Sequence, residues 1–416
     1  MLQALYRMPC QEISWGNDRA EDLHQPASTL PAFRACQVTH KTNMEKPSNH
    51  KIQEIILPPD LEERTYAQFD ELVSIGKIFY DEQTEPGEIL DDGFLVSVQL
   101  QSFGATKLQG EANSDIFRLI QIEFRTVPFL QKKPVLPPDD PGRRSNHSTQ
   151  TSRSNTPSTG PKNDGSDSSS PSASSSASPS PDTGVPKGPF INPKPEEVIL
   201  DSVGQHHRLM LNKFCIYRPM LVIPTKEFAL QSDDLDADDI AALWALLNAY
   251  HSFEPLAMYN RGVNGGSSQG HKHLQIFPAP PLAPFHGKAA NFWPARATSS
   301  TEVADNIPNV PFKHFVLRIP PHASTETIIE MHDKLLALTR KAHAEAGNDP
   351  GSDYNVAMSR EWIALIPRVT AGPPDGPFGT STVGMLGIPA IRGPEDRRKW
   401  EELGNTRFLA QLGIPI

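Results

Sequence analysis

The chain has 416 residues, including 41 prolines and three cysteines, and its formal net charge is −10 with a sequence pI near 5.8. A chain this acidic lacks the basic footprint that nucleic acids and anionic membrane surfaces require, so we expect neither as a partner. Three scattered cysteines exclude a disulfide framework, and no apolar leader occupies the first twenty residues. These features predict a cytoplasmic or nuclear protein.

The N-terminal part of the chain alternates between ordered and irregular patterns. Residues 1–55 show no hydrophobic periodicity and predict a loosely ordered extension. Residues 61–73 carry an apolar stripe at helical spacing, whereas residues 116–127 alternate as a strand does. Lys133 and Pro134 follow that strand and predict a basic turn.

Residues 137–190 form a segment rich in serine and proline. The segment has too little apolar surface to offset the entropy of ordering it, so it predicts a long disordered insertion. Recurring Ser-Pro and Thr-Pro pairs leave a phosphorylated regulatory segment as an alternative.

The rest of the chain mixes strands and helices and predicts an α+β fold. The acidic run 233–239 predicts the start of a helix, because the helix macrodipole favours negative charge there. Further apolar patterns predict strands at 206–214, 220–224, 256–260, 355–358 and 362–367, and a helix at 325–346. The short connections predict that 206–214 and 220–224 form a hairpin-like pair and that 355–358 and 362–367 form an antiparallel pair.

The segment GSSQGHKHLQ, residues 266–275, predicts a functional strand behind a flexible loop. On a strand, His271, His273 and Gln275 share one face, while Lys272 and Leu274 share the other. The preceding glycines and serines allow close backbone approach and offer several donors, which suits a phosphate.

Three interpretations of the two histidines compete. Ordinary packing is the usual explanation for an isolated histidine, but the adjacent glycine-serine loop disfavours it here. Metal binding needs further ligands, and His206 with His207 would face opposite ways on a strand, so we predict no protein-held metal. In nucleophilic catalysis, a neutral imidazole attacks phosphorus and divides one transfer into two steps. We favour His273 as that nucleophile.

Residues Asn260–Gln275 resemble the active-site segment of the fungal diadenosine tetraphosphate phosphorylases, also called ATP adenylyltransferases, within the histidine triad superfamily. Segments 130–134, 211–214 and 354–362 are similar to other stretches of that family in the same order. The resemblance runs from about residue 59 to the C-terminus, apart from the insertion.

The resemblance implies a histidine-triad-like antiparallel sheet flanked by helices. The implied activity is a ping-pong transfer of AMP, which converts diadenosine tetraphosphate and phosphate to ADP and ATP. The expected divisions are an extension (1–55), the N-terminal part of the catalytic domain (56–136), the insertion (137–190), the catalytic core (191–300) and a C-terminal ATP adenylyltransferase region (301–416).

The resemblance also implies roles for individual residues. The catalytic set is His273 as nucleophile, Gln275 as a phosphate contact and His271. The implied substrate-binding residues are Lys133, Asn212, Lys213, Asn260, Gly266, Ser267, Ser268, Gln269, Ser381 and Arg392. At Ser381 and Arg392 the sequence departs from the family's asparagine and lysine.

The expected ligands are dinucleoside polyphosphates, ATP, ADP and phosphate. A divalent cation such as Mg²⁺ is expected to accompany the polyphosphate, with no organic cofactor. Two alternatives remain: a histidine triad hydrolase, in which the position of Gln275 is usually a second acid-base histidine, and a catalytically weak nucleotide-binding module. The oligomeric state is left open.

Overall fold

The computed structural model describes residues 54–80, 86–89, 122–133, 188–282, 291–373 and 379–416. They belong to one compact unit, residues 51–416. The predicted extension lies outside the described residues except for 54 and 55, as does the insertion except for 188–190.

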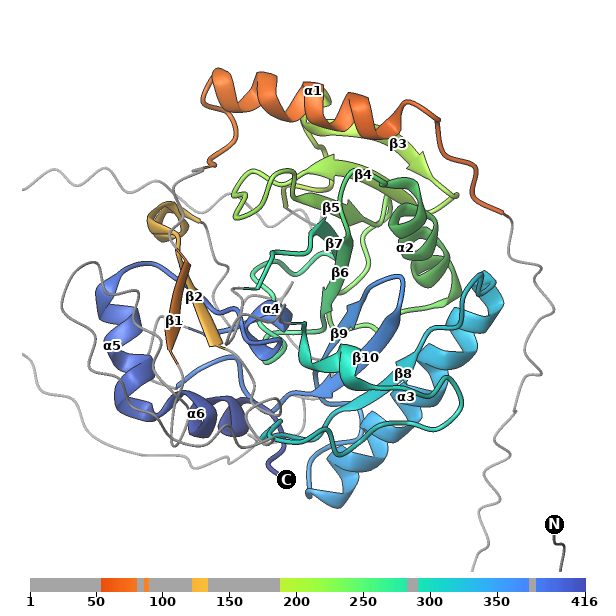
Figure 1. Cartoon of the computed structure of the whole chain (residues 1–416). Coiled ribbons are helices and arrows are strands. Elements are labelled where there is room, and N and C mark those ends of the chain that lie inside the picture. Colours follow the sequence, from red (N-terminus) through yellow and green to blue (C-terminus); the bar gives the residue numbers. More distant parts are fainter. Residues whose placement is uncertain (1–53, 81–85, 90–121, 134–187, 283–290, 374–378) are drawn as a thin grey trace, which may run out of the picture. The chain divides into compact units, whose positions relative to one another are not determined.

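An eight-stranded sheet forms the centre of this unit (Figure 1). Its strand order is β3-β4-β5-β7-β6-β9-β10-β8, and every neighbouring pair is antiparallel. The strands are β3 (Val198–Val203), β4 (His207–Leu211), β5 (Leu221–Pro224), β6 (Pro255–Asn260), β7 (His273–Pro278), β8 (Phe315–Arg318), β9 (Tyr354–Met358) and β10 (Trp362–Pro367). Because β6 pairs with β9, the sheet crosses residue 300, where we expected a division.

Helices cover both faces of the sheet (Figure 1). Helices α2 (Ala237–Ala249) and α3 (Thr325–Glu345) pack together, and α2 contacts β6 while α3 contacts β10. The short helix α4 (Thr382–Met385) contacts β6 and β9, and it lies on the side of the sheet opposite α2. Coverage of both faces explains why every residue of β6, β9 and β10 is buried.

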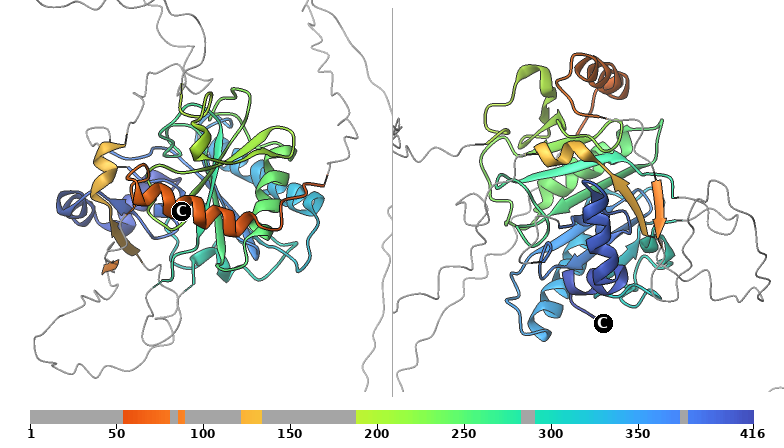
Figure 2. Two further views of the ribbon diagram at one scale, coloured as in Figure 1. Left: turned by 90° about the horizontal axis from the view of Figure 1, so that it is seen from above. Right: turned by 90° about the vertical axis from the view of Figure 1, so that its left-hand side faces the viewer.

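Smaller elements complete the unit. Helix α1 (Leu61–Ser74) packs beside β3, whereas the C-terminal helices α5 (Pro394–Leu403) and α6 (Asn405–Leu412) pack together elsewhere (Figures 1 and 2). A second sheet joins β1 (Pro86–Ile89), β2 (Ile122–Thr126) and β11 (Ala390–Ile391). Three 3₁₀ helices occur among the described residues: η2 (Pro128–Lys132), η3 (Pro195–Glu197) and η4 (Trp293–Arg296).

The predicted α+β class and the antiparallel sheet flanked by helices are confirmed. The pairing of β4 with β5 and that of β9 with β10 match the predicted neighbours. The strand predicted at 206–214 ends at Leu211, because the Asn212 side chain accepts from the Phe214 N–H at 3.0 Å and turns the chain. Of the strand predicted at 116–127, the described part is β2, and residues 116–121 lie outside the described residues.

The acidic start of α2 has a more local cause than the macrodipole alone. Asp236 is the N-cap and accepts from the Asp239 N–H at 2.9 Å, while the Asp239 carboxylate accepts from the Asp236 N–H at 2.9 Å. This reciprocal pair satisfies two backbone donors at the first turn. Within the described residues, no helix combines the length and apolar character needed to cross a membrane.

Candidate active site

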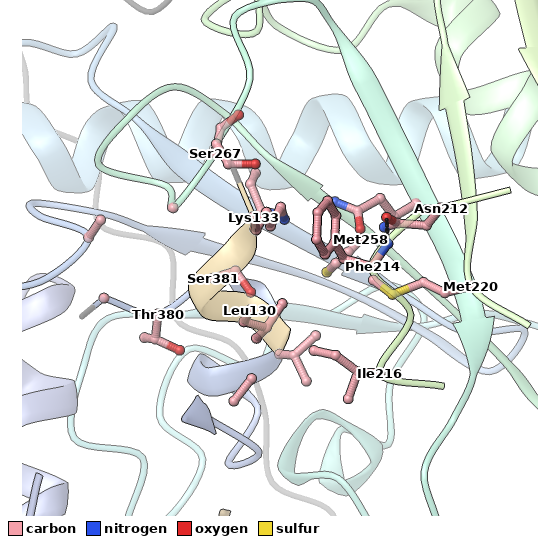
Figure 3. Close-up of a pocket in the computed structure, with 18 of the residues that line it drawn as sticks. Leu130, Lys133, Asn212, Phe214, Ile216, Met220, Met258, Ser267, Thr380 and Ser381 are labelled. Atoms are coloured by element: carbon pink, nitrogen blue, oxygen red, sulfur yellow. Dashed lines mark hydrogen bonds between the residues drawn. The ribbon is translucent and has the colours of Figure 1, made fainter. Parts of the chain in front are cut away.

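A cavity of about 530 Å³ opens on the face of the sheet that carries α4 (Figure 3). This is within the usual range for small-molecule sites, about 300–1,000 Å³. Its walls come from η2, the segment between β4 and β5, β6, β7, the glycine-serine loop and the segment around α4. The predicted site residues that line it are Lys133, Asn212, Asn260, Gly266, Ser267, Ser268, His273, Gln275, Ser381 and Arg392. The structure therefore gathers most of the predicted set around one cavity.

The His273 imidazole has a defined tautomer. Its Nδ1 lies 2.8 Å from the main-chain oxygen of His271. Since a carbonyl oxygen only accepts, Nδ1 carries the hydrogen and Nε2 keeps its lone pair. Burial is the main cause that lowers the pKa of His273, to about 4, and the positive charge of Lys133 acts in the same direction. The imidazole is therefore neutral and nucleophilic at pH 7.

His271 contributes its main chain rather than its ring to this arrangement. Its Nε2 lies 3.0 Å from Thr225 Oγ1 and 3.2 Å from the Glu227 oxygen, and its side chain is absent from the cavity wall. A single bridge to Leu230 holds His271 just before β7 begins. The structure thus places the His271 imidazole beside the site and its carbonyl against the predicted nucleophile.

The opposite face of the histidine strand carries a buried ion pair. The Lys272 ammonium pairs with the Asp239 carboxylate and donates to the Asp234 oxygen at 2.8 Å. The other Asp239 oxygen lies 2.8 Å from His207 Nε2. Burial alone would raise the pKa of Asp239, but the hydrogen bond with His207 and the charge of Lys272 outweigh it and hold that pKa below its usual value. This cluster ties β7, α2 and β4 together behind His273.

The predicted phosphate loop packs directly on the segment before α4. Gly266 has φ +89°, and a Cβ there would lie 2.6 Å from the Thr380 oxygen. Only glycine combines that backbone conformation with such close approach. Ser267 and Ser268 line the cavity, whereas the Gln269 side chain does not. The Gln269 main chain instead closes the turn, because its oxygen accepts from Ser267 Oγ at 2.7 Å.

Asn260 is held by α4 and β9. Its Oδ1 accepts from the Thr382 N–H at 2.9 Å, from Thr382 Oγ1 at 2.7 Å and from Asn355 Nδ2 at 3.1 Å. With the oxygen occupied in this way, the donors of the Asn260 amide are left for a ligand in the cavity.

This wall is supported by a residue that the sequence pattern did not reveal. Arg368 is fully buried, and its guanidinium donates to Asn355 Oδ1 and, at 3.1 Å, to the Thr380 oxygen. Asn355 in turn donates to the Gly265 oxygen at 2.7 Å. Burial lowers the pKa of Arg368 to about 9. The signal in the sequence was only an arginine at the end of an apolar strand, which says nothing about partners more than ten residues away.

The predicted basic residues differ in their position relative to the cavity wall. Lys133 lines it, and burial lowers its pKa. The Arg392 guanidinium also lines it but is bound to the Asp396 carboxylate at 2.6 and 2.7 Å. Lys213 lies outside the wall, with Nζ 5.9 Å from the centre of the Phe79 ring, because it alternates with Asn212 and Phe214, which face inward.

Within the described ranges, no group of three or more His, Cys, Asp or Glu side chains is placed to hold a metal ion. The arrangement instead provides a neutral imidazole with one fixed hydrogen, a glutamine amide two residues along the same strand face, a glycine-serine loop and a lysine. These groups suit covalent transfer of a phosphorus-centred group. The class defined by the fold and the site is a nucleotidyltransferase.

The comparisons with known proteins identify the family. Residues 170–289 match the Ap4A phosphorylase N-terminal domain, and residues 308–415 match the ATP adenylyltransferase C-terminal domain. These two matches together span more than half of the chain. The chain belongs to the Ap4A phosphorylase family.

Curated relatives and solved structures agree with that assignment. Diadenosine tetraphosphate phosphorylase 2 of Saccharomyces cerevisiae is 28% identical over 260 residues, which cover 55% of this chain and 76% of the yeast protein. Protein APA1 of the same yeast is 27% identical over 248 residues, with the same coverage of each chain. The crystal structure of yeast Ap4A phosphorylase Apa2 with Ap4A has a TM-score of 0.56 and 20% identity, covering 86% of this chain and 99% of that one. The complex of Apa2 with AMP gives the same TM-score and identity and shares the fold.

Proposed function

We propose that this chain transfers AMP from diadenosine tetraphosphate to inorganic phosphate, with ADP and ATP as products. The observation that carries the proposal is the buried His273 imidazole, whose Nδ1 hydrogen is held by the His271 carbonyl beside the cavity. The printed names of the yeast relatives, together with the yeast structures containing Ap4A and AMP, support the choice of substrate.

In the first step, the Nε2 lone pair of His273 attacks the α-phosphorus of one adenosine. A P–N bond forms, the P–O bond to the remaining triphosphate breaks, and ATP leaves with the bonding electrons. The His271 carbonyl keeps the Nδ1 hydrogen in place, so the adenylylated ring carries a positive charge. Gln275 can donate to a non-bridging oxygen of the transferred phosphoryl group.

In the second step, an oxygen of inorganic phosphate attacks the same phosphorus. The new P–O bond gives ADP, the P–N bond breaks, and its electrons return to Nε2 of His273. Lys133 and the donors of Ser268 offset the charge of the phosphates in both steps.

A divalent cation such as Mg²⁺ would enter with the polyphosphate and offset its charge. The cavity wall contains Asp396, but that carboxylate is bound to Arg392, so the side chains present do not form a ligand set for the ion. We also propose that the enzyme works in the cytoplasm or the nucleus, a placement supported by its composition.

Incubation of the purified protein with diadenosine tetraphosphate, with and without phosphate, tests the proposal. ADP plus ATP formed only when phosphate is present supports the phosphorylase. AMP formed without phosphate would identify a hydrolase instead. Binding of the dinucleotide with no product would identify a nucleotide-binding module.

A further inference from the structure

An aromatic side chain from outside the predicted site covers the histidine pair. The Phe190 ring centre lies 5.0 Å from that of His273, with the planes at 44°, and 5.8 Å from that of His271, with the planes at 70°. Phe190 lies in the turn that precedes β3, and its side chain is 9% exposed. It is not part of the cavity wall, so it packs against the predicted nucleophile outside the cavity.

Phe190 is fixed by the sheet itself. It packs in a small cluster with Met210 of β4 and Val222 of β5. The register pairs Met210 with Val222 and Val222 with Gln275, so these side chains share the sheet face that carries His273. The ring therefore rests on the neighbouring strands and cannot move away from His273 without exposing this cluster.

We propose that Phe190 is a positioning residue for the transfer, which holds the plane of the His273 imidazole and stabilises the ring in its adenylylated, positively charged state. This inference rests on the proposed function and adds a residue to it. The backbone hydrogen bond from Nδ1 fixes one atom of the imidazole, whereas a ring packed against it limits rotation about the bond to Cβ. Together the two contacts direct Nε2 into the cavity.

The positive charge of the intermediate gives Phe190 a second role. In the part of the chain that the structure describes, the charged groups that face the pair are Lys133, which acts on His273, and Arg208, which acts on His271. Both disfavour a positive imidazole. An aromatic face attracts a cation within about 6 Å of its centre, and Phe190 lies inside that distance. Phe190 would therefore offset part of the repulsion once His273 carries AMP.

The test uses Phe190→Ala, Phe190→Leu and Phe190→Tyr, with Phe253→Leu as a matched control. Phe253 is a partly buried ring that contacts Tyr66 and Tyr250 and lies outside the cavity wall. The measurement is the rate of AMP–enzyme formation from diadenosine tetraphosphate without phosphate, across pH, together with kcat and KM in the full reaction.

We expect Phe190→Ala to slow AMP–enzyme formation at least about tenfold, with KM changed less than about threefold. Because the His273 imidazole is then less buried, the pKa of the acid limb of the pH–rate profile should also rise toward the ordinary histidine value of about 6.5. Phe190→Leu keeps the burial but removes the aromatic face, so its pH–rate profile should show an acid limb at or below that of the wild type while the rate falls. Phe190→Tyr retains the ring and should restore the rate to within about twofold, and the control should resemble the wild type.

The inference would be overturned if Phe190→Ala formed AMP–enzyme at the wild-type rate with the wild-type pH–rate profile. A change in KM alone would also overturn it. If the alanine variant does not fold, the leucine and tyrosine variants decide in the same way, because equal rates in those two would remove any role for the aromatic ring. An NMR titration of His273 in the substrate-free protein separates this inference from the proposed function. If the wild type forms no AMP–enzyme, the proposed function fails, and an unchanged His273 pKa in Phe190→Ala then overturns the positioning role as well.

Discussion

The Lys272 ammonium and the Asp239 carboxylate form an ion pair directly behind the strand that presents His273. Their side chains are 4% and 1% exposed, so neither charge is solvated. Because Lys272 lies between His271 and His273, this pair anchors the segment whose carbonyl fixes the His273 tautomer. The charge behind the strand and the imidazole in front of it belong to one structural unit.

Lys272→Met should destabilise the protein by about 3–5 kcal/mol, because it leaves the buried Asp239 carboxylate without its cation. Urea unfolding measures the loss. A second change, Asp239→Asn, should recover part of it by removing the unpaired charge. Lys341→Met is the matched control, since the Lys341–Glu345 pair is solvent-exposed and such pairs contribute about 1 kcal/mol or less. Equal effects at the two lysines would show that the buried pair does not support the strand.

His273→Ala should reduce turnover by at least about a thousandfold, because no other side chain replaces a lost covalent nucleophile. Product formation from diadenosine tetraphosphate and phosphate is the measurement, and a thermal melt checks that the variant is folded. Near-normal turnover in a folded variant would falsify the mechanism proposed here.

Lys133→Gln should lower kcat/KM about tenfold or more, equivalent to about 1.4 kcal/mol, because a partly desolvated cation beside the polyphosphate is lost. The neighbouring Lys132→Gln is the control. Lys132 is exposed, with Nζ 5.8 Å from the centre of the Phe79 ring, and it does not line the cavity. Its kcat/KM should stay within about twofold of the wild type. Similar losses in both variants would mean that general surface charge, rather than the cavity, is responsible.

Gly266→Ala should impair both folding and activity. Gly347 and Gly266 both have positive φ, at +77° and +89°, but a Cβ at Gly347 would have no neighbour within 4 Å. Gly347→Ala should therefore cost only the backbone strain, about 1–2 kcal/mol. Gly266→Ala adds the clash with the Thr380 oxygen and should lower kcat/KM as the loop moves. The free energy of unfolding and kcat/KM of both variants check this expectation. Equal stability of the two variants, with an unchanged kcat/KM in Gly266→Ala, would show that the loop tolerates a side chain.

Local pattern was sufficient for much of the fold. The apolar stripes at 61–73 and 325–346 predicted α1 and α3, and alternation predicted the pairings of β4 with β5 and β9 with β10. These features depend on short-range periodicity, which a sequence displays directly. The two-residue strand β11 and the late helices α5 and α6 were not predicted, because such short elements exist mainly through their tertiary contacts.

Spacing along the sequence by itself determined that His273 and Gln275 share one strand face and that a glycine-serine loop precedes them, because the side-chain period of a strand is two. Only the tertiary structure decided which atoms meet. It directed the His271 ring toward Thr225 and Glu227, bound Arg392 to Asp396, and brought Phe190 onto His273. The physical reason is that burial, charge and contact in a cavity depend on which distant segments fold together, and no local pattern specifies that.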